Sequence, residues 1–169
     1  AGGGIVHLPP GRYAISATLW VPSGVTLQGA GRANSIITVS ESRPMRFDLP
    51  QEIERAMPGH WVHPPKERDE GVMLWVRDHA SMTDVGLESG PGVWLGVLAA
   101  HTGATIKRCN LRILDGDKQA IQVSWGSYGF TLTDCDILGH GGLFMMHGPH
   151  RQAYVGGNTF RCLSPGESN

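Results

Sequence analysis

The sequence contains no apolar run close to the roughly 20 residues that a membrane-spanning helix requires, and no start that resembles a signal peptide. It also lacks an excess of charge of either sign, because 14 Lys and Arg residues are matched by 15 Asp and Glu residues. A nearly neutral chain has no long-range field that would draw it onto nucleic acid or an anionic membrane. We therefore expect neither nucleic acid nor a membrane as a partner.

Cysteine is scarce, with only Cys109, Cys135 and Cys162 in the chain and no CxxC pair among them. An odd number of cysteines closes no complete set of disulfides, and this spacing fits neither a zinc ribbon nor a redox motif. We expect three buried free thiols, because unpaired cysteine behaves as a small apolar residue.

Glycine and proline are abundant, with 24 and 11 residues, and they separate short runs rich in Val, Ile, Leu and Thr such as "GVMLWVRD" and "FTLTDCDIL". Short β-rich runs bounded by turn residues predict strands. The stretch "DLPQEIERAM" at 48–57 differs, since it has an acidic start, a proline in the first turn and apolar residues four apart. We expect one short helix there, inside an insertion at 42–71 that is either a surface excursion or a binding loop.

A triplet of a small, a polar and an apolar or small residue recurs along the chain. It reads CNL at 109–111, CDI at 135–137 and GNT at 157–159, with an earlier copy at Gly86. Its polar member falls at 110, 136 and 158, steps of 26 and 22 residues, which is a period typical of a solenoid. We expect Cys109 and Cys135 to stack inward and the polar residues to form a ladder at one corner. A β-sandwich or jelly roll would explain the strands but not the period.

The first coil carries a more specific pattern. The segment "GGGIVHLPPGRYAISATLWVPSGVTLQGAGR" at 2–32 resembles the opening of right-handed parallel β-helix proteins of the pectate-lyase-like superfamily. The resemblance implies an all-β, right-handed parallel β-helix (solenoid). We expect a single such domain over 1–169, with the one short helix in the 42–71 insertion. It does not imply one activity, because the superfamily includes polysaccharide lyases, glycoside hydrolases, carbohydrate epimerases and viral tailspikes.

The superfamily usually binds ligand in a groove over one parallel sheet. If "VMLWV", "VWLGVLA", "AIQVSW" and "LFMMH" are neighbouring strands of that sheet, the residues at or just past their ends are His79, His101, Trp125 and His147, at steps of 22, 24 and 22. We expect these residues, with Arg77 nearby, to stack sugar rings and to donate hydrogen bonds to hydroxyl groups. The alternative is that histidine is simply tolerated in these turns.

The opposite edge of the same sheet has Asp115, Asp117 and Lys118 before one strand and His140 before the next. This loosely resembles polygalacturonase-type glycoside hydrolases, in which a "DGDDxxAI" coil precedes a "GHG" coil. The resemblance places Asp117 at the first aspartate and His140 at the motif histidine, but Lys118 stands where the second aspartate should be. Inverting glycosidases need two carboxyl groups, so either Asp115 supplies one, the chemistry differs, or "DGD" is only a turn.

A lyase would use other groups, because β-elimination from a uronic acid needs a cation to neutralise the carboxylate and a base to remove a proton. Lys118, Arg151, His147 and His150 are candidates for these roles. We expect no cofactor and no metal site. Asp115, Asp117 and Asp78 leave calcium open as an alternative, whereas a Gly-Pro loop between His147 and His150 fits zinc less well.

Taken together, these patterns predict a secreted or periplasmic carbohydrate-active enzyme that cleaves a polysaccharide or oligosaccharide by hydrolysis or β-elimination. The alternative is a noncatalytic carbohydrate-binding or tailspike-like module. We also expect the chain to be part of a longer solenoid, or to need a companion fragment, because an open end of a solenoid exposes unpaired strand edges.

Overall fold

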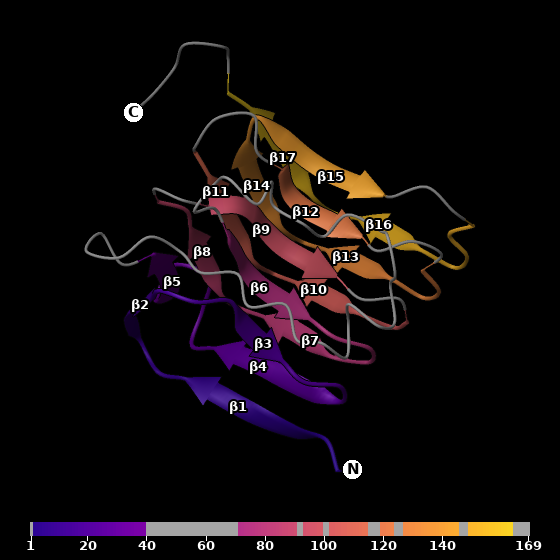
Figure 1. The fold of residues 1–169 in the computed structure, drawn as a ribbon, viewed down its shortest axis with the longest axis horizontal. Coiled ribbons are helices and arrows are strands. Elements are labelled where there is room, and N and C mark those ends of the chain that lie inside the picture. The colour runs from indigo at the N-terminus through magenta and orange to yellow at the C-terminus, as the bar shows by residue number, and fades with distance from the viewer. Residues whose placement is uncertain are drawn as a thin grey trace.

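The computed structural model describes residues 2–39, 71–90, 93–99, 102–114, 119–123, 127–145 and 149–163. Its strands form three sheets in which every pair of neighbours is parallel (Figure 1). The first sheet contains β1 (Gly4–Leu8), β4 (Val25–Gly29), β7 (Ser81–Thr83), β10 (Thr105–Lys107), β13 (Thr131–Thr133) and β16 (Tyr154–Gly156). The second contains β2 (Gly11–Ile15), β5 (Ser35–Val39), β8 (Gly86–Glu88), β11 (Asn110–Ile113), β14 (Asp136–Gly139) and β17 (Thr159–Cys162). The third contains β3 (Leu19–Val21), β6 (Gly71–Val76), β9 (Val93–Ala99), β12 (Gln119–Val123) and β15 (Gly141–Met145).

The chain visits the three sheets in a constant order, so that each coil adds one strand to each sheet. This cycle is the defining feature of a parallel β-helix, and the predicted all-β solenoid is confirmed. The insertion expected at 42–71 falls in the sequence between β5 and β6, and its residues before Gly71 lie outside the described part of the chain. The predicted helix at 48–57 lies outside the described residues.

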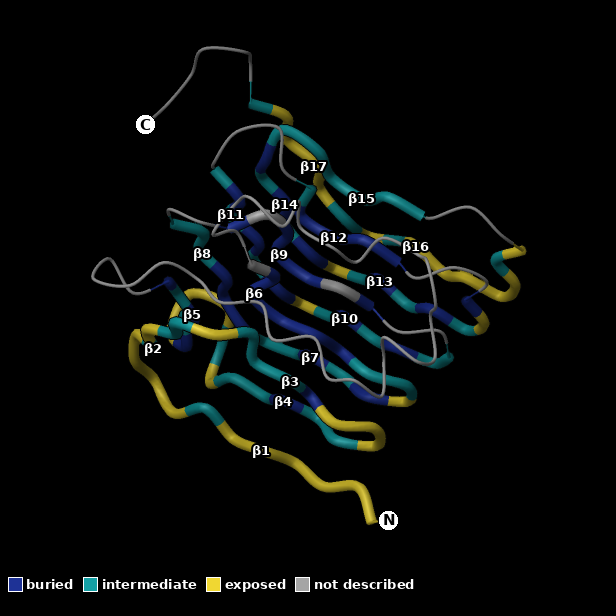
Figure 2. Tube along the Cα trace, in the orientation of Figure 1, coloured by how far each residue is buried: buried dark blue, intermediate teal, exposed yellow. Residues whose placement is uncertain are grey.

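The core is built by stacking equivalent side chains from successive coils. In the first sheet, register places Leu27, Met82, Ile106 and Leu132 one above another, and all four are buried. Burial is greatest in the middle coils and least in β1 and β17, the outermost strands of their sheets (Figure 2). Each coil is too thin to enclose a core of its own, so the apolar contacts that stabilise the fold lie mainly between coils.

The recurring triplet is in register for its first copies and out of register for its last. Asn110 pairs with both Gly86 and Asp136, as predicted, but Asp136 pairs with Thr159. Asn158 therefore occupies the position of Cys135, and its place in the predicted polar ladder is wrong. The strand step from Asp136 to Thr159 is 23 residues, one more than the alignment of polar residues gave.

Asn158 instead bridges two coils at a corner of the fold. Its Oδ1 accepts a hydrogen bond from the backbone N–H of Cys135 at 2.9 Å, and its Nδ2 donates to the carbonyl of Leu132 at 2.9 Å. In the two preceding coils this corner is filled by the stacked thiols of Cys109 and Cys135, with the Cys109 N–H 3.4 Å from the Cys135 sulfur. The amide thus replaces apolar packing by two hydrogen bonds.

The predicted burial of the thiols is confirmed for two of the three. Cys109 and Cys135 are buried and free, whereas Cys162 is free but exposed, so the expectation is wrong for that residue. Cys162 lies in β17, the outermost strand of the second sheet, so it has a neighbouring strand on one side only. Burial raises the pKa of the Cys109 thiol well above its ordinary value.

Candidate functional site

The third sheet is the surface on which the sequence placed a ligand groove. The four runs expected to share that sheet do so, as β6, β9, β12 and β15 in consecutive order. Leu74, Val97 and Ile121 are paired across it and belong to the buried core. Because side chains alternate along a strand, the next position of each strand faces outward.

That outward column carries side chains that sequence reasoning missed. Trp20 pairs with Trp75, and Gln122 pairs with Phe144. The rings of Trp20 and Trp75 lie with their centroids 5.6 Å apart at an interplanar angle of 49°. The alternation in "MLWV" and "LFM" was the available signal, because it puts Trp75 and Phe144 on the opposite face from the core leucines.

The exposure of this column is uneven. Trp20 and Phe144 are half-buried, whereas Trp75 is 3% and Gln122 is 2% exposed. The indole Nε1 of Trp75 is buried, and no acceptor for it lies within the described residues. A buried donor without an acceptor costs about 1–3 kcal/mol.

The edge at which the third-sheet strands begin, called here the entering edge, carries one group of candidates. Gln119 at the start of β12 pairs with Gly141 at the start of β15. The half-buried His140 directly precedes Gly141, as Lys118 directly precedes Gln119 in the sequence. Asp115, Asp117 and Lys118 themselves lie outside the described residues.

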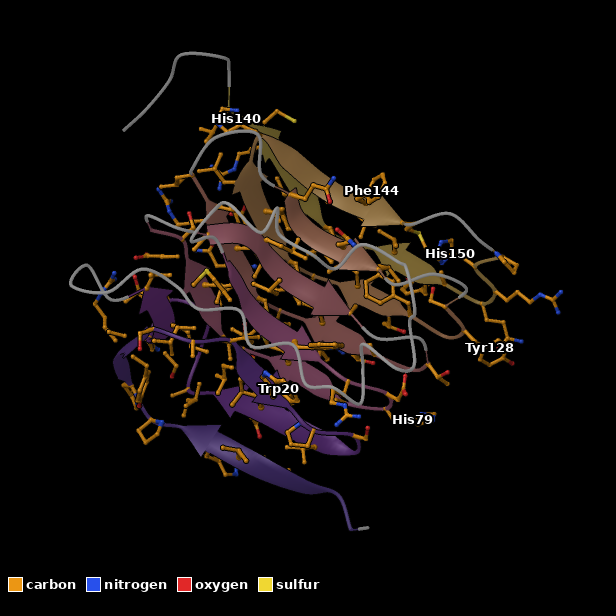
Figure 3. The ribbon with its side chains drawn as sticks, viewed as in Figure 1. Trp20, His79, Tyr128, His140, Phe144 and His150 are labelled. Atoms are coloured by element: carbon orange, nitrogen blue, oxygen red, sulfur yellow. The ribbon has the colours of Figure 1, made fainter. Side chains whose placement is uncertain are left out.

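The edge at which these strands end, called here the leaving edge, carries the second group. Parallel bridges join Thr102 to Tyr128 and Tyr128 to Arg151, and the N–H of Thr102 donates to Oδ1 of Asp78 at 2.8 Å. Figure 3 shows His79, Tyr128 and His150 along this one edge of the stack. His79, Tyr128 and Arg151 are exposed, and Arg77 and His150 are half-buried. His101, Trp125 and His147 lie outside the described residues.

At this edge the connections that follow the strand ends differ in length from coil to coil. Val76 pairs with Ala99, the last residue of β9, and the N–H of His79 donates to the carbonyl of Thr102. The connection from the end of each strand to the bridged corner residue becomes longer in each successive coil. These connections run from Ala99 to Thr102, from Val123 to Tyr128 and from Met145 to Arg151. Because successive loops differ in length, positions beyond the strand ends lose the register that the strands keep.

Two histidines of the candidate set lie at opposite ends of one strand. His140 precedes β15 and His150 follows it, and Figure 3 places them at opposite edges of the third sheet. β15 has five residues, and at about 3.3 Å per residue these edges are roughly 17 Å apart. His140 and His150 are therefore too far apart to act together on one bond.

The leaving edge also contains a close pair of polar side chains. The hydroxyl oxygen of Ser127 lies 2.7 Å from Nδ1 of His150. Ser127 is 1% exposed, so its hydroxyl is within the fold although it lies next to the exposed Tyr128. No sequence pattern indicated this pair, because its members are 23 residues apart and belong to different coils.

Charges also gather at the corner between the first and second sheets. Arg108 binds Asp84 through two hydrogen bonds of 2.7 and 2.6 Å, and the hydrogen bond from Arg108 lowers the pKa of that carboxyl group. These side chains, together with Gly31, Arg32 and Asp134, line a hollow of about 410 Å³. Arg32 donates to the backbone carbonyl of Asp134, which ties the loop after β4 to a later coil.

Two further observations apply to the described part of the chain. It contains no group of three or more His, Cys, Asp or Glu side chains placed to hold a metal ion. Within the same residues, no helix is long and apolar enough to cross a membrane.

Comparison with known proteins found no match, either to a protein-family model, to a curated protein or to a solved structure. The parallel β-helix therefore rests on the strand topology of this chain.

Proposed function

We propose that this β-helix binds an extended polysaccharide along the outward face of its third sheet and cleaves it at the entering edge. The observation that carries the proposal is the pairing of Gln119 with Gly141 in neighbouring coils. Lys118 and His140 directly precede these two residues in the sequence. Neighbouring coils are about 4.7–4.9 Å apart, which is close to the length of one sugar residue. A linear polymer can thus meet the same surface at each coil.

The aromatic column supports the binding part of the proposal. Trp20 and Phe144 are half-buried and face outward, so that each can cover a face of a sugar ring. Trp75 lies between them in the same column, and its ring packs 5.6 Å from that of Trp20, centroid to centroid. Membership of the pectate-lyase-like superfamily, and a secreted or periplasmic location, are parts of the same proposal.

The catalytic part assigns roles to Asp115, Asp117, Lys118 and His140. In hydrolysis, the two aspartates would act as acid and base, with His140 orienting one of them. In β-elimination, Lys118 would neutralise the carboxylate of a uronic acid and His140 would remove the proton. At the leaving edge, Arg77, His79, His101, Trp125, His147, His150 and Arg151 would bind the polymer without reaching the scissile bond.

A panel of acidic and neutral polysaccharides tests the proposal. New reducing ends without ultraviolet absorbance indicate hydrolysis, and absorbance of an unsaturated uronate indicates elimination. The matched control is the Asp115→Asn, Asp117→Asn, His140→Gln triple variant, which we expect to bind the same polymer without cleaving it. Failure of the wild-type chain to bind any polysaccharide would refute the proposal as a whole.

A second candidate function is a noncatalytic carbohydrate-binding module. It is favoured by the outward column itself, since the described members Trp20, Trp75, Gln122 and Phe144 carry no ionisable group. Binding without new reducing ends or unsaturated products would select this function.

A further inference from the structure

Cys109 and Cys135 form a pair of thiols that the proposed function does not use. They occupy the same corner, between the first and second sheets, in neighbouring coils. On one side of the pair, Arg108 N–H donates to the Thr133 carbonyl at 2.9 Å. On the other side, Asp136 N–H donates to the Cys109 carbonyl, also at 2.9 Å. The distance between the two cysteines is therefore set by the backbone of the coils.

The spacing of the coils fits a disulfide bond. Neighbouring parallel strands lie about 4.7–4.9 Å apart, and the α-carbons of a disulfide are usually about 4.4–6.8 Å apart. The sulfur of Cys135 already lies 3.4 Å from the backbone nitrogen of Cys109, which donates a hydrogen bond to it. Both α-carbons can thus keep their positions while rotation about the side-chain bonds brings the sulfurs together.

The surroundings of the two sulfurs do not compete strongly with this bond. Within the described residues, their other contacts are weak hydrogen bonds to backbone carbonyl oxygens, the shortest being 3.3 Å from Cys109 Sγ to Lys107 and 3.2 Å from Cys135 Sγ to Thr133. The same part of the chain has no group of three or more His, Cys, Asp or Glu side chains placed to hold a metal ion. A reaction of the thiols with each other therefore breaks no strong interaction.

We infer that Cys109 and Cys135 are an oxidation site, at which a small hydroperoxide converts the two thiols into a disulfide between neighbouring coils. The hydrogen bond with the Cys109 thiol lowers the pKa of Cys135, whereas burial raises the pKa of Cys109, so the thiolate forms at Cys135. The oxidant has to be small, because Cys135 is only 2% exposed. This inference does not rest on the proposed function.

The reaction has two steps. The Cys135 thiolate attacks one oxygen of hydrogen peroxide, the O–O bond breaks, and the sulfur becomes a sulfenic acid while hydroxide leaves and takes up a proton. The Cys109 sulfur then attacks the sulfenic sulfur, the S–O bond breaks, and the hydroxyl group leaves as water with the Cys109 proton. The two thiols are oxidised to one disulfide, and one peroxide is reduced to two waters.

The bond should also stabilise the fold. It joins residues that are 26 positions apart, and a disulfide stabilises mainly by restricting the unfolded chain. It ties the coil of β10 and β11 to the coil of β13 and β14, which lies directly before the last described coil. We therefore expect the oxidised chain to unfold at a higher urea concentration than the reduced chain.

The first test uses the full chain with Cys162→Ser, in which Cys109 and Cys135 are the only cysteines. After treatment of the native chain with hydrogen peroxide, we expect no thiol to titrate in denaturant, and both to titrate again after reduction. Trypsin cleaves after Arg112 and Lys118, between the two cysteines, so the peptides that contain them should stay joined until reduction. Thiols that still titrate, or oxidation to sulfinic or sulfonic acid in place of the disulfide, would overturn the inference.

The second test compares urea midpoints, with Cys109→Ser in the same background as the matched control. This control keeps Cys135 without its partner, so peroxide should leave a sulfenic acid that a cyclic diketone probe traps, and the midpoint should not rise. In the Cys162→Ser chain the midpoint should rise on oxidation. A midpoint there that falls or stays the same would show that the native coils do not accommodate the bond, and the inference would be wrong. If the control does not fold, peptide mapping and the midpoint of the Cys162→Ser chain decide alone.

Discussion

The imidazole of His79 lies against the α-carbon of Gly103, so that a Cβ at position 103 would fall 2.6 Å from His79 Nδ1. Gly103 also has a φ of 63°, in the left-handed region that favours glycine. His79 reaches this contact from the coil below, where its own N–H donates to the carbonyl of Thr102 at 2.7 Å. The ring is thus part of the corner packing as well as a candidate ligand-binding group.

This contact predicts the effect of Gly103→Ala. The variant should lower the free energy of unfolding by about 1–3 kcal/mol, since it combines backbone strain with steric overlap. Urea unfolding measures the change. Gly4→Ala is the control, because a Cβ at Gly4 has no atom within 4 Å. In a His79→Ala background, Gly103→Ala should lower the free energy of unfolding by a smaller amount, because the ring is no longer there to overlap. An equal decrease in that background would mean that backbone strain alone destabilises the variant.

Asn158→Ala should lower the free energy of unfolding, although Asn158 lies in the last described coil. The change removes the hydrogen bonds to Cys135 N–H and Leu132 O and leaves both groups without that partner. We expect a loss of about 1–3 kcal/mol in the free energy of unfolding. Asn34→Ala, which removes one exposed bond of 3.3 Å to the Ala30 carbonyl, should cost less than about 0.5 kcal/mol. Equal losses for the two variants would contradict the bridging role.

The Asp84–Arg108 pair predicts a pH dependence of stability. The hydrogen bond from Arg108 holds the pKa of Asp84 below its ordinary value, so folding favours the ionised carboxylate. The contribution is complete above the unfolded-state pKa, about 3.9, and is lost as pH falls through the lower folded-state pKa. Because the pair lies at the surface, we expect less than about 1 kcal/mol. The stability difference between wild type and Asp84→Asn should vanish in acid, and a difference that grows in acid would refute this assignment.

The three thiols should differ in their reaction with an aromatic disulfide reagent. Cys162 is exposed and should react at once, whereas buried Cys109 and Cys135 should react only when the chain unfolds. The measurement is the number of thiols titrated before and after addition of denaturant. Cys162→Ser should abolish the fast phase, and a fast phase that persists in this variant would mean that the Cys109–Cys135 corner opens in the native state.

Phe144→Ala tests the binding face of the proposed function. If a sugar ring packs on Phe144, the variant should weaken polysaccharide binding by about 1–3 kcal/mol. Tyr154→Ala is the matched control, because Tyr154 is an exposed aromatic residue on the first sheet, in β16. The measurement is affinity by isothermal titration calorimetry. A larger loss of affinity in Tyr154→Ala than in Phe144→Ala would indicate that the polysaccharide binds on the first sheet.

The strands and their cyclic order could be read from the sequence. Runs such as "GVMLWV" and "TLTDCDIL" carry β-branched and apolar residues between turn residues, and their repetition at intervals close to one coil is found in few folds besides a solenoid. The runs "ATIKRCNLRIL" and "FTLTDCDIL" each contain two strands, β10 with β11 and β13 with β14. Each run bends at Arg108 or Asp134, where a positive φ turns the chain from the first sheet into the second. Periodicity shows how often the chain turns but not at which residue.

By itself, the sequence determined the all-β solenoid, the third sheet as a set of four neighbouring runs, and the inward stacking of Cys109 on Cys135. Only the tertiary structure decided that Asn158 takes a cysteine position, that Trp75 packs against Trp20 on the outward column, and that Ser127 meets His150. The physical reason is that hydrogen bonding between parallel strands holds the register only within the sheets. At the corners, connections of different length shift each coil relative to the next, and which side chains meet there depends on the packing of neighbouring coils.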